Sequence, residues 1–161
     1  MNAATAASAA GGTQALRAIL WAGFICGTMD ITAALIVYGQ YGLAPMRLLQ
    51  GIAAGLLGPR SFEGGIPTAA LGLFCHYFIA YSAATVYFAA SRGLPILVRH
   101  FIGFGALYGV AVYFFMQLVV IPLSNAARRP FSPKMTIIGL VIHIFCVGLP
   151  IATGVRRFSG D

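Results

Sequence analysis

Charged side chains are scarce in this chain. They make up 8% of its 161 residues, and only three of them are acidic. A soluble globular domain carries charge on about a quarter of its residues, so the shortage excludes an ordinary soluble domain. The sequence also lacks a Ser-His-Asp spacing, a phosphate-binding glycine loop and a paired-carboxylate motif. It therefore gives no support to an enzymatic reaction.

Cysteine is also rare. Cys26, Cys75 and Cys146 are the three cysteines, and each falls inside an apolar segment. An odd number of cysteines within membrane segments argues against a disulfide framework. We expect them to behave as small buried hydrophobic side chains.

Ten arginines and lysines give the chain a net charge of +7, and all of them lie outside the apolar runs. In a membrane protein such residues set the topology and contact lipid headgroups. The lipid bilayer is therefore the expected partner of these cations, and a nucleic-acid partner is not predicted.

Hydrophobic residues make up 60% of the chain and gather in runs long enough to cross a membrane, which takes about 20 residues of helix. We predict an all-α membrane protein with a single domain over 17–157. A disordered tail is expected over 1–16, where small residues show no periodicity. The four transmembrane helices are predicted at 18–38, 67–90, 101–121 and 135–155.

The stretch 45–57 is apolar along one side only and is too short to span a bilayer. We predict a short interfacial amphipathic helix there, ended by Gly58 and Pro59. Arg47 and Gln50 lie off the apolar stripe, so both side chains are expected to face water. The stripe consists of Met46, Leu48, Leu49, Ile52, Leu56 and Leu57.

A short motif occurs twice, 67 residues apart: an apolar residue, then Gly-Leu-x-x-His-x-Phe, with its histidine at His76 and at His143. Two GxxxG pairs, beginning at Gly23 and at Gly105, are 82 residues apart. The two offsets differ by about the length of the interfacial helix. We therefore predict two repeated helical hairpins, with the interfacial helix inserted in the first.

Each predicted transmembrane helix carries one strongly polar side chain. Asp30, His76 and His143 are expected at a similar depth, roughly 12 Å from the surface formed by the loops between helices one and two and between helices three and four. Gln117 is expected about one turn closer to that surface, at the rim. We predict that these four residues form one polar layer inside the membrane.

Three interpretations of this layer remain open from the sequence. It is a hydrogen-bonded network that fixes helix packing, or a proton or ion pathway, because an Asp with His partners can change charge near neutral pH. The least favoured is a haem b site in which His76 and His143 are the axial ligands, since four-helix haem proteins often carry further histidines. No CxxCH motif, which would attach a c-type haem, is present. No other metal or cofactor is predicted.

The loop residues predict one ion pair and the orientation of the chain in the membrane. Glu63, the only glutamate, is expected to pair with Arg128 or Arg129. Five cations flank the helices on the side of the termini and five on the other side. Because the arginines on the side of the termini lie close to helix ends, we predict cytoplasmic termini.

The second half of the chain resembles the YagU-like family of bacterial inner-membrane proteins. The residues that carry the likeness are His76 and Phe78, Gly105-Ala106-Leu107, Ile121-Pro122-Leu123, and Gly139 to His143. The resemblance implies a bacterial inner-membrane location and a role in stress, with links to acid tolerance. It implies no catalytic residue.

The favoured function is thus that of a small multi-pass protein of the bacterial cytoplasmic membrane, active in transport, proton handling or a stress response. The alternative is a structural or assembly subunit, which would work as a homo-oligomer or beside a partner in a membrane complex.

Overall fold

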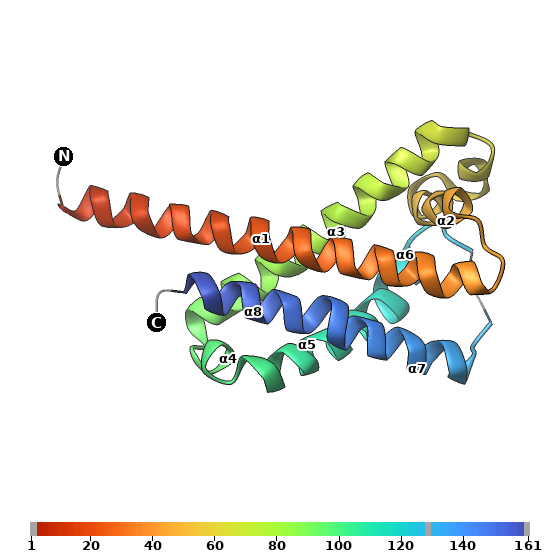
Figure 1. Cartoon of the computed structure of the whole chain (residues 1–161). Coiled ribbons are helices and arrows are strands. Elements are labelled where there is room, and N and C mark those ends of the chain that lie inside the picture. The colour runs from red at the N-terminus through yellow and green to blue at the C-terminus, as the bar shows by residue number, and fades with distance from the viewer. Residues whose placement is uncertain (1–2, 128–129, 160–161) are drawn as a thin grey trace.

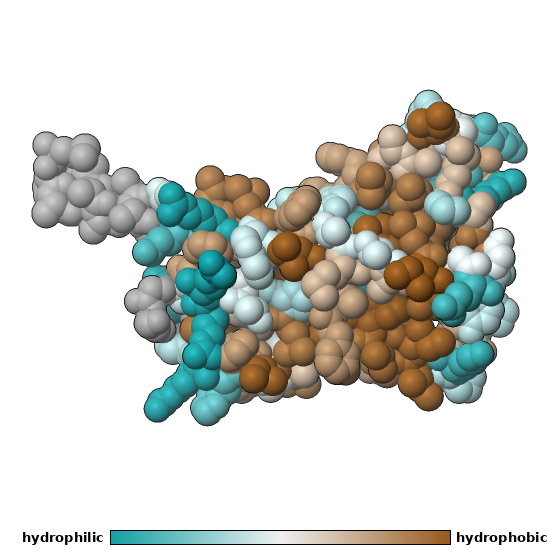
Figure 2. Space-filling view, viewed as in Figure 1, coloured by the Kyte–Doolittle hydropathy of each residue, from teal (hydrophilic) through white to brown (hydrophobic). Residues whose placement is uncertain are grey.

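The computed structural model describes residues 3–127 and 130–159, and every regular element in that part is helical. Four helical stretches are long and apolar enough to cross a membrane. The prediction of an all-helical protein with four such helices is therefore confirmed. Hydrophobic side chains cover the middle of the molecule, and hydrophilic ones gather at its two ends (Figure 2). The four stretches are Gly12–Gln40, Gly65–Gly93, Phe101–Leu123 and Pro133–Phe158.

The chain runs back and forth between the two ends of the molecule, so its first and last helices begin and end on the same side (Figure 1). We name that side the terminal end, which holds Arg17, Arg92 and Arg157, and the opposite side the loop end. The elements that form the four stretches are α1 (Ala3–Gln40), α3 (Gly65–Gly93), α5 (Phe101–Phe115), η2 (Met116–Val120), α6 (Ile121–Leu123), α7 (Pro133–Ile142), η3 (His143–Gly148) and α8 (Leu149–Phe158). The elements between the stretches are α2 (Pro45–Leu57), η1 (Gly58–Phe62) and α4 (Ile96–Arg99).

Helix α1 starts at Ala3, inside the stretch 1–16 for which we predicted a disordered tail. That prediction is wrong for the described residues of the stretch. Alanine has the highest helix propensity of all residues. A residue added to an existing helix also gains a hydrogen bond without the cost of a new nucleus. The alanine-rich stretch therefore extends the transmembrane helix.

Helix α2 covers Pro45–Leu57, the range that the sequence predicts. Proline is well tolerated at the start of a helix, where the N–H groups lack partners. The helix ends at Gly58, whose φ of +63° is a left-handed conformation that favours glycine. Figure 1 shows α2 nearly end-on, so it lies across the direction of the long helices at the loop end.

The side chain of Gln50 does not face water, and our prediction for it is wrong, since it is only 2% exposed. Its amide nitrogen donates to the carbonyl of Gly65 over 3.1 Å and lies 3.4 Å from the hydroxyl of Thr68. Helix α2 approaches α3 so closely that a β-carbon at Gly72 would clash with the Leu49 carbonyl. The contact buries the side of α2 that carries Gln50, whose amide finds partners at the start of α3.

Two π-helical segments interrupt the last two membrane-spanning stretches. Segments η2 and η3 are each followed within two residues by a proline, at Pro122 and at Pro150. Proline has no N–H group, and in an α-helix its ring collides with the carbonyl four residues earlier. A wider turn just before the proline accommodates that collision.

Glycines set the distance between α5 and η3, the π-helical segment between α7 and α8. A β-carbon at Gly109 would clash with the carbonyl of His143, and one at Gly148 would clash with the carbonyl of Gly105. In a membrane, where no hydrophobic force draws helices together, such close backbone contact is a main source of helix association. Helix α5 and segment η3 are therefore in direct backbone contact.

Replacing Gly109 by alanine should destabilise the protein, whereas the same change at Gly103 on the same helix should not. The added methyl group at Gly109 meets the backbone of His143, while nothing lies within 4 Å of Gly103. We expect a loss of about 1–3 kcal/mol in the free energy of unfolding for Gly109→Ala and a gain of about 0.5–1 kcal/mol for Gly103→Ala. Unfolding of the detergent-solubilised protein by SDS measures both. Equal changes at the two positions would contradict the close contact.

A cysteine at position 50 should react slowly with a membrane-impermeant thiol reagent, and a cysteine at position 47 should react rapidly. Gln50 is buried against α3, whereas Arg47 is exposed. The labelling rates are compared in a protein whose native cysteines, Cys26, Cys75 and Cys146, are replaced by alanine. If both positions label at the same rate, α2 does not pack against α3 through Gln50.

Candidate functional site

A cavity of about 120 Å³ lies between the membrane helices. Three of the side chains that line it are ionisable and strongly polar: Asp30 from α1, His76 from α3 and His143 at the start of η3. The volume has room for a few water molecules. The rest of the lining is mainly apolar and consists of Cys26, Gly27, Ile52, Ile79, Ala80, Ala83, Val112, Met116 and Val147.

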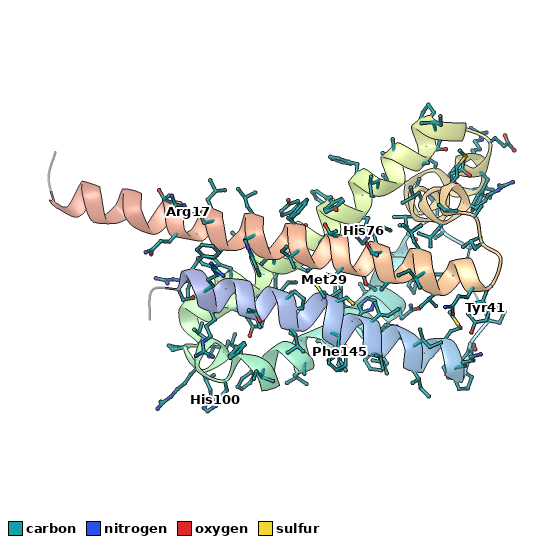
Figure 3. All side chains as sticks on the ribbon, viewed as in Figure 1. Arg17, Met29, Tyr41, His76, His100 and Phe145 are labelled. Atoms are coloured by element: carbon teal, nitrogen blue, oxygen red, sulfur yellow. The ribbon has the colours of Figure 1, made fainter. Side chains whose placement is uncertain are left out.

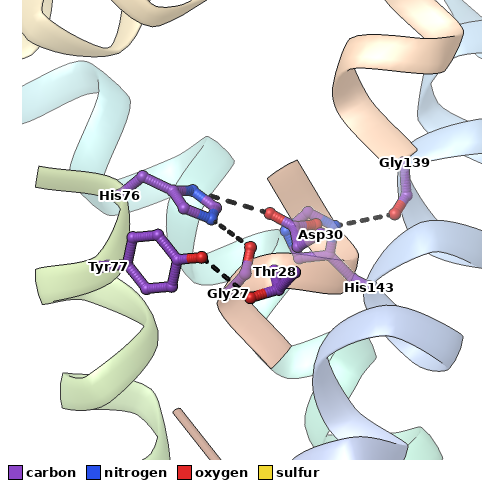
Figure 4. A network of polar contacts seen from close by, with 7 residues as sticks. All are labelled: Gly27, Thr28, Asp30, His76, Tyr77, Gly139 and His143. Atoms are coloured by element: carbon purple, nitrogen blue, oxygen red, sulfur yellow. Dashed lines mark hydrogen bonds and ion pairs between the residues drawn. The ribbon is translucent and has the colours of Figure 1, made fainter. Parts of the chain in front are cut away.

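The ring of His76 is held between a backbone carbonyl and a carboxylate. Its Nε2 atom lies 2.8 Å from the carbonyl oxygen of Gly27, and its Nδ1 atom lies 4.0 Å from Oδ2 of Asp30 (Figure 4). A carbonyl oxygen only accepts hydrogen bonds, so Nε2 carries a hydrogen and donates it. Nδ1 is therefore the nitrogen that gains or loses a proton, and it faces Asp30.

His143 is held in the opposite tautomer. Its Nδ1 atom lies 2.9 Å from the carbonyl oxygen of Gly139, so Nδ1 donates and Nε2 is the nitrogen open to protonation. Tyr113 packs edge-on against the ring, with 5.2 Å between the ring centroids. In Figure 4, Asp30 overlaps the ring of His143 in the view and is joined by a dashed line to His76, and all three residues line the cavity.

Glycine at position 27 lets His76 reach the backbone of α1. A β-carbon there would press on the ring of Tyr77, so a larger residue would push α3 away. The tyrosine hydroxyl lies 2.9 Å from the Thr28 hydroxyl and adds a second polar link between the two helices. Neither link was predicted from the sequence, although the Gly23–Gly27 pair on the same face of α1 as Asp30 indicates a close approach of helices.

Gln117 does not join the site. Its side chain is exposed and does not line the cavity, whereas its neighbour Met116 does. The wide turn of η2 begins at Met116 and changes the rotation of the residues that follow it. An expectation based on regular α-helix therefore places Gln117 wrongly. The structure thus brings together Asp30, His76 and His143 of the predicted layer.

The geometry does not fit a haem between His76 and His143. The cavity of about 120 Å³ is well below the 300–1,000 Å³ of pockets that hold drug-sized ligands, and a porphyrin is larger than most of those. His76 also directs one nitrogen at the Gly27 carbonyl and the other toward Asp30. In the part of the chain that the structure describes, no group of three His, Cys, Asp or Glu residues could hold a metal ion.

The remaining candidates lie apart from the cavity. Glu63 is exposed at the loop end, and its predicted partners Arg128 and Arg129 lie outside the described residues. The third histidine, His100, is exposed at the terminal end and lies apart from His76, which is in the middle of the molecule (Figure 3). The cavity between the helices is therefore the site at which ionisable groups converge.

Comparison with known proteins gives no relative for this chain: no family model, no curated protein and no solved structure matches it.

Proposed function

We propose that this protein conducts protons in the bacterial cytoplasmic membrane through the cavity between Asp30, His76 and His143. The observation that carries the proposal is that three ionisable side chains, each from a different membrane-spanning stretch, line one small cavity. Ionisable residues within membrane helices are costly and usually mark substrate, ion or proton pathways. Histidine suits this role because its ordinary titration falls between pH 5 and 8.

A proton suits this cavity better than a metal cation does. Hard cations such as Ca²⁺ and Mg²⁺ require about six or more oxygen ligands, whereas the polar side chains of the lining are one carboxylate and two imidazoles. Each imidazole has one nitrogen tied to a carbonyl and one nitrogen open to protonation. A proton therefore moves among Asp30, Nδ1 of His76 and Nε2 of His143, through bridging water, while neither ring has to turn.

The location and the two-hairpin organisation belong to the same proposal. The resemblance to the YagU-like family supports a bacterial inner membrane and a response to acid, and the arginines near helix ends support cytoplasmic termini. Helix α2, which lies across the bundle at the loop end, suits an interfacial position.

In each hairpin the second glycine of the GxxxG pair lies against a histidine residue: the carbonyl of Gly27 pairs with the imidazole of His76, and Gly109 lies against the backbone of His143.

The alternative is a structural or assembly role, and one observation favours it. Both histidines make hydrogen bonds to carbonyls, and the His76 bond joins two helices, as expected for a network that fixes packing. A protein with that role alone would move no protons. Flux measurements therefore separate the two functions.

Vesicles that contain the purified protein should acidify when an inward proton gradient is applied, and vesicles without protein should not. Asp30→Asn, His76→Gln and His143→Gln should each reduce the flux to the background rate, because each removes a group that binds the proton. His100→Gln should leave it unchanged, since His100 is exposed at the terminal end. A pH-sensitive dye inside the vesicles, with the potential clamped by K⁺ and valinomycin, gives the rate.

If the wild type conducts no better than empty vesicles, the protein is not a proton conductor. If all three variants at the cavity conduct normally, protons take another route.

Asp30→Asn and His76→Gln should be non-additive in their effects on the free energy of unfolding. The two side chains lie within 4.0 Å, and residues in contact show interaction energies of about 0.5–3 kcal/mol. SDS unfolding of the two single variants and the double variant measures this energy. The matched cycle of Asp30→Asn with His100→Gln should be additive. Additivity in both cycles would show that Asp30 and His76 do not act as a pair, even if flux is observed.

A further inference from the structure

A second concave site lies at the terminal end, away from the cavity between Asp30, His76 and His143. It is a groove of about 180 Å³ formed by α1, α3 and α8. Two of its side chains are polar, Gln14 and Arg92, and two are aromatic, Phe88 and Phe158; Ala15 of α1 also lines it. The groove therefore combines one full positive charge with an apolar floor.

Arg92 has no acidic partner among the described residues. The acidic side chains that the structure describes are Asp30, inside the bundle, and Glu63, at the loop end. The guanidinium group is exposed, and it stands one residue before the end of α3 at Gly93. Arg92 therefore lies at the terminal end of the stretch Gly65–Gly93, which is long and apolar enough to cross a membrane.

We propose that this groove binds an anionic phospholipid, with the phosphate at Arg92 and the upper acyl chain against Phe88 and Phe158. Arginine binds phosphate through a planar fork of N–H donors. The aromatic rings give an apolar surface that a free phosphate ion cannot use. Arg17 lies at the same end (Figure 3), where Arg99 ends α4 and Arg156 and Arg157 lie in the last turn of α8, and these cations attract negatively charged headgroups to that end.

The chain carries a fluorescent reporter close to this groove. Trp21 is the only tryptophan, and it follows Gln14 by seven residues, which places both on one face of α1 about two turns apart. Its ring lies against Gly154 of α8, four residues before Phe158. A lipid chain that descends from the groove therefore passes near the indole ring.

The test is the quenching of Trp21 by brominated lipids in vesicles of phosphatidylcholine and phosphatidylglycerol mixed in equal amounts. Bromine is placed on the chains of one lipid or of the other. For the full-length wild type we expect brominated phosphatidylglycerol to quench more strongly, with an anionic preference of about five-fold, which corresponds to about 1 kcal/mol for one arginine at a membrane surface. Arg92→Gln should remove the preference, and Arg99→Gln, an exposed arginine outside the groove, should keep it.

Added inorganic phosphate should not reduce the quenching by brominated phosphatidylglycerol; if it does, the site binds free phosphate and the proposal is wrong. Equal quenching by the two brominated lipids in the wild type would also overturn it, and that comparison needs no variant to fold. An equal loss of preference in Arg92→Gln and Arg99→Gln would show a diffuse surface attraction in place of a site.

Discussion

The hydrogen bond between His76 and the carbonyl of Gly27 is the contact on which the centre of this bundle depends. It joins α1 to α3 over 2.8 Å, and it requires that position 27 carry no side chain, because the tyrosine ring next to it fills that space. The same bond fixes the tautomer of His76 and turns its second nitrogen toward Asp30. One glycine thus sets the distance between α1 and α3 and the orientation of the His76 ring relative to Asp30.

The partial burial of Asp30 gives a physical reason for the cavity. A carboxylate at the centre of a membrane helix costs about 2.5–3.5 kcal/mol or more. Here its side chain keeps 21% of its surface exposed, next to a histidine that is 12% exposed. The carboxylate therefore has both a nearby group that can become a cation and space for water. The nearby histidine and the space for water both lower the free-energy cost of a charged carboxylate in the membrane. Proton transfer requires the same two features.

The membrane-spanning helices could be predicted from the sequence because length and hydropathy are local properties. Helix α2 was predicted to the residue for a similar reason, since proline and glycine mark its ends. The burial of Gln50 could not be predicted, because it depends on the side of α2 that meets α3, and the partners of the amide come from a later part of the chain. Gln117 was misplaced because periodicity arguments assume a regular α-helix, and η2 is not regular. Within the site, Asp30 and the two histidines could be named from depth and spacing, whereas the carbonyl partners of the histidines are backbone atoms without a sequence signature.

The depth of Asp30 makes the cavity sensitive to the membrane voltage. The residue lies ten positions before the end of α1 at Gln40, about 15 Å along the helix axis, which is about half of the roughly 30 Å hydrocarbon core. On the proposed proton pathway, a proton that enters from either side therefore crosses about half of the transmembrane electric field before it reaches Asp30. Each 100 mV would then change the free energy of moving a proton to this depth by about 1 kcal/mol. Proton movement through the cavity, as proposed, would thus depend on the electrical potential of the cell as well as on its acidity.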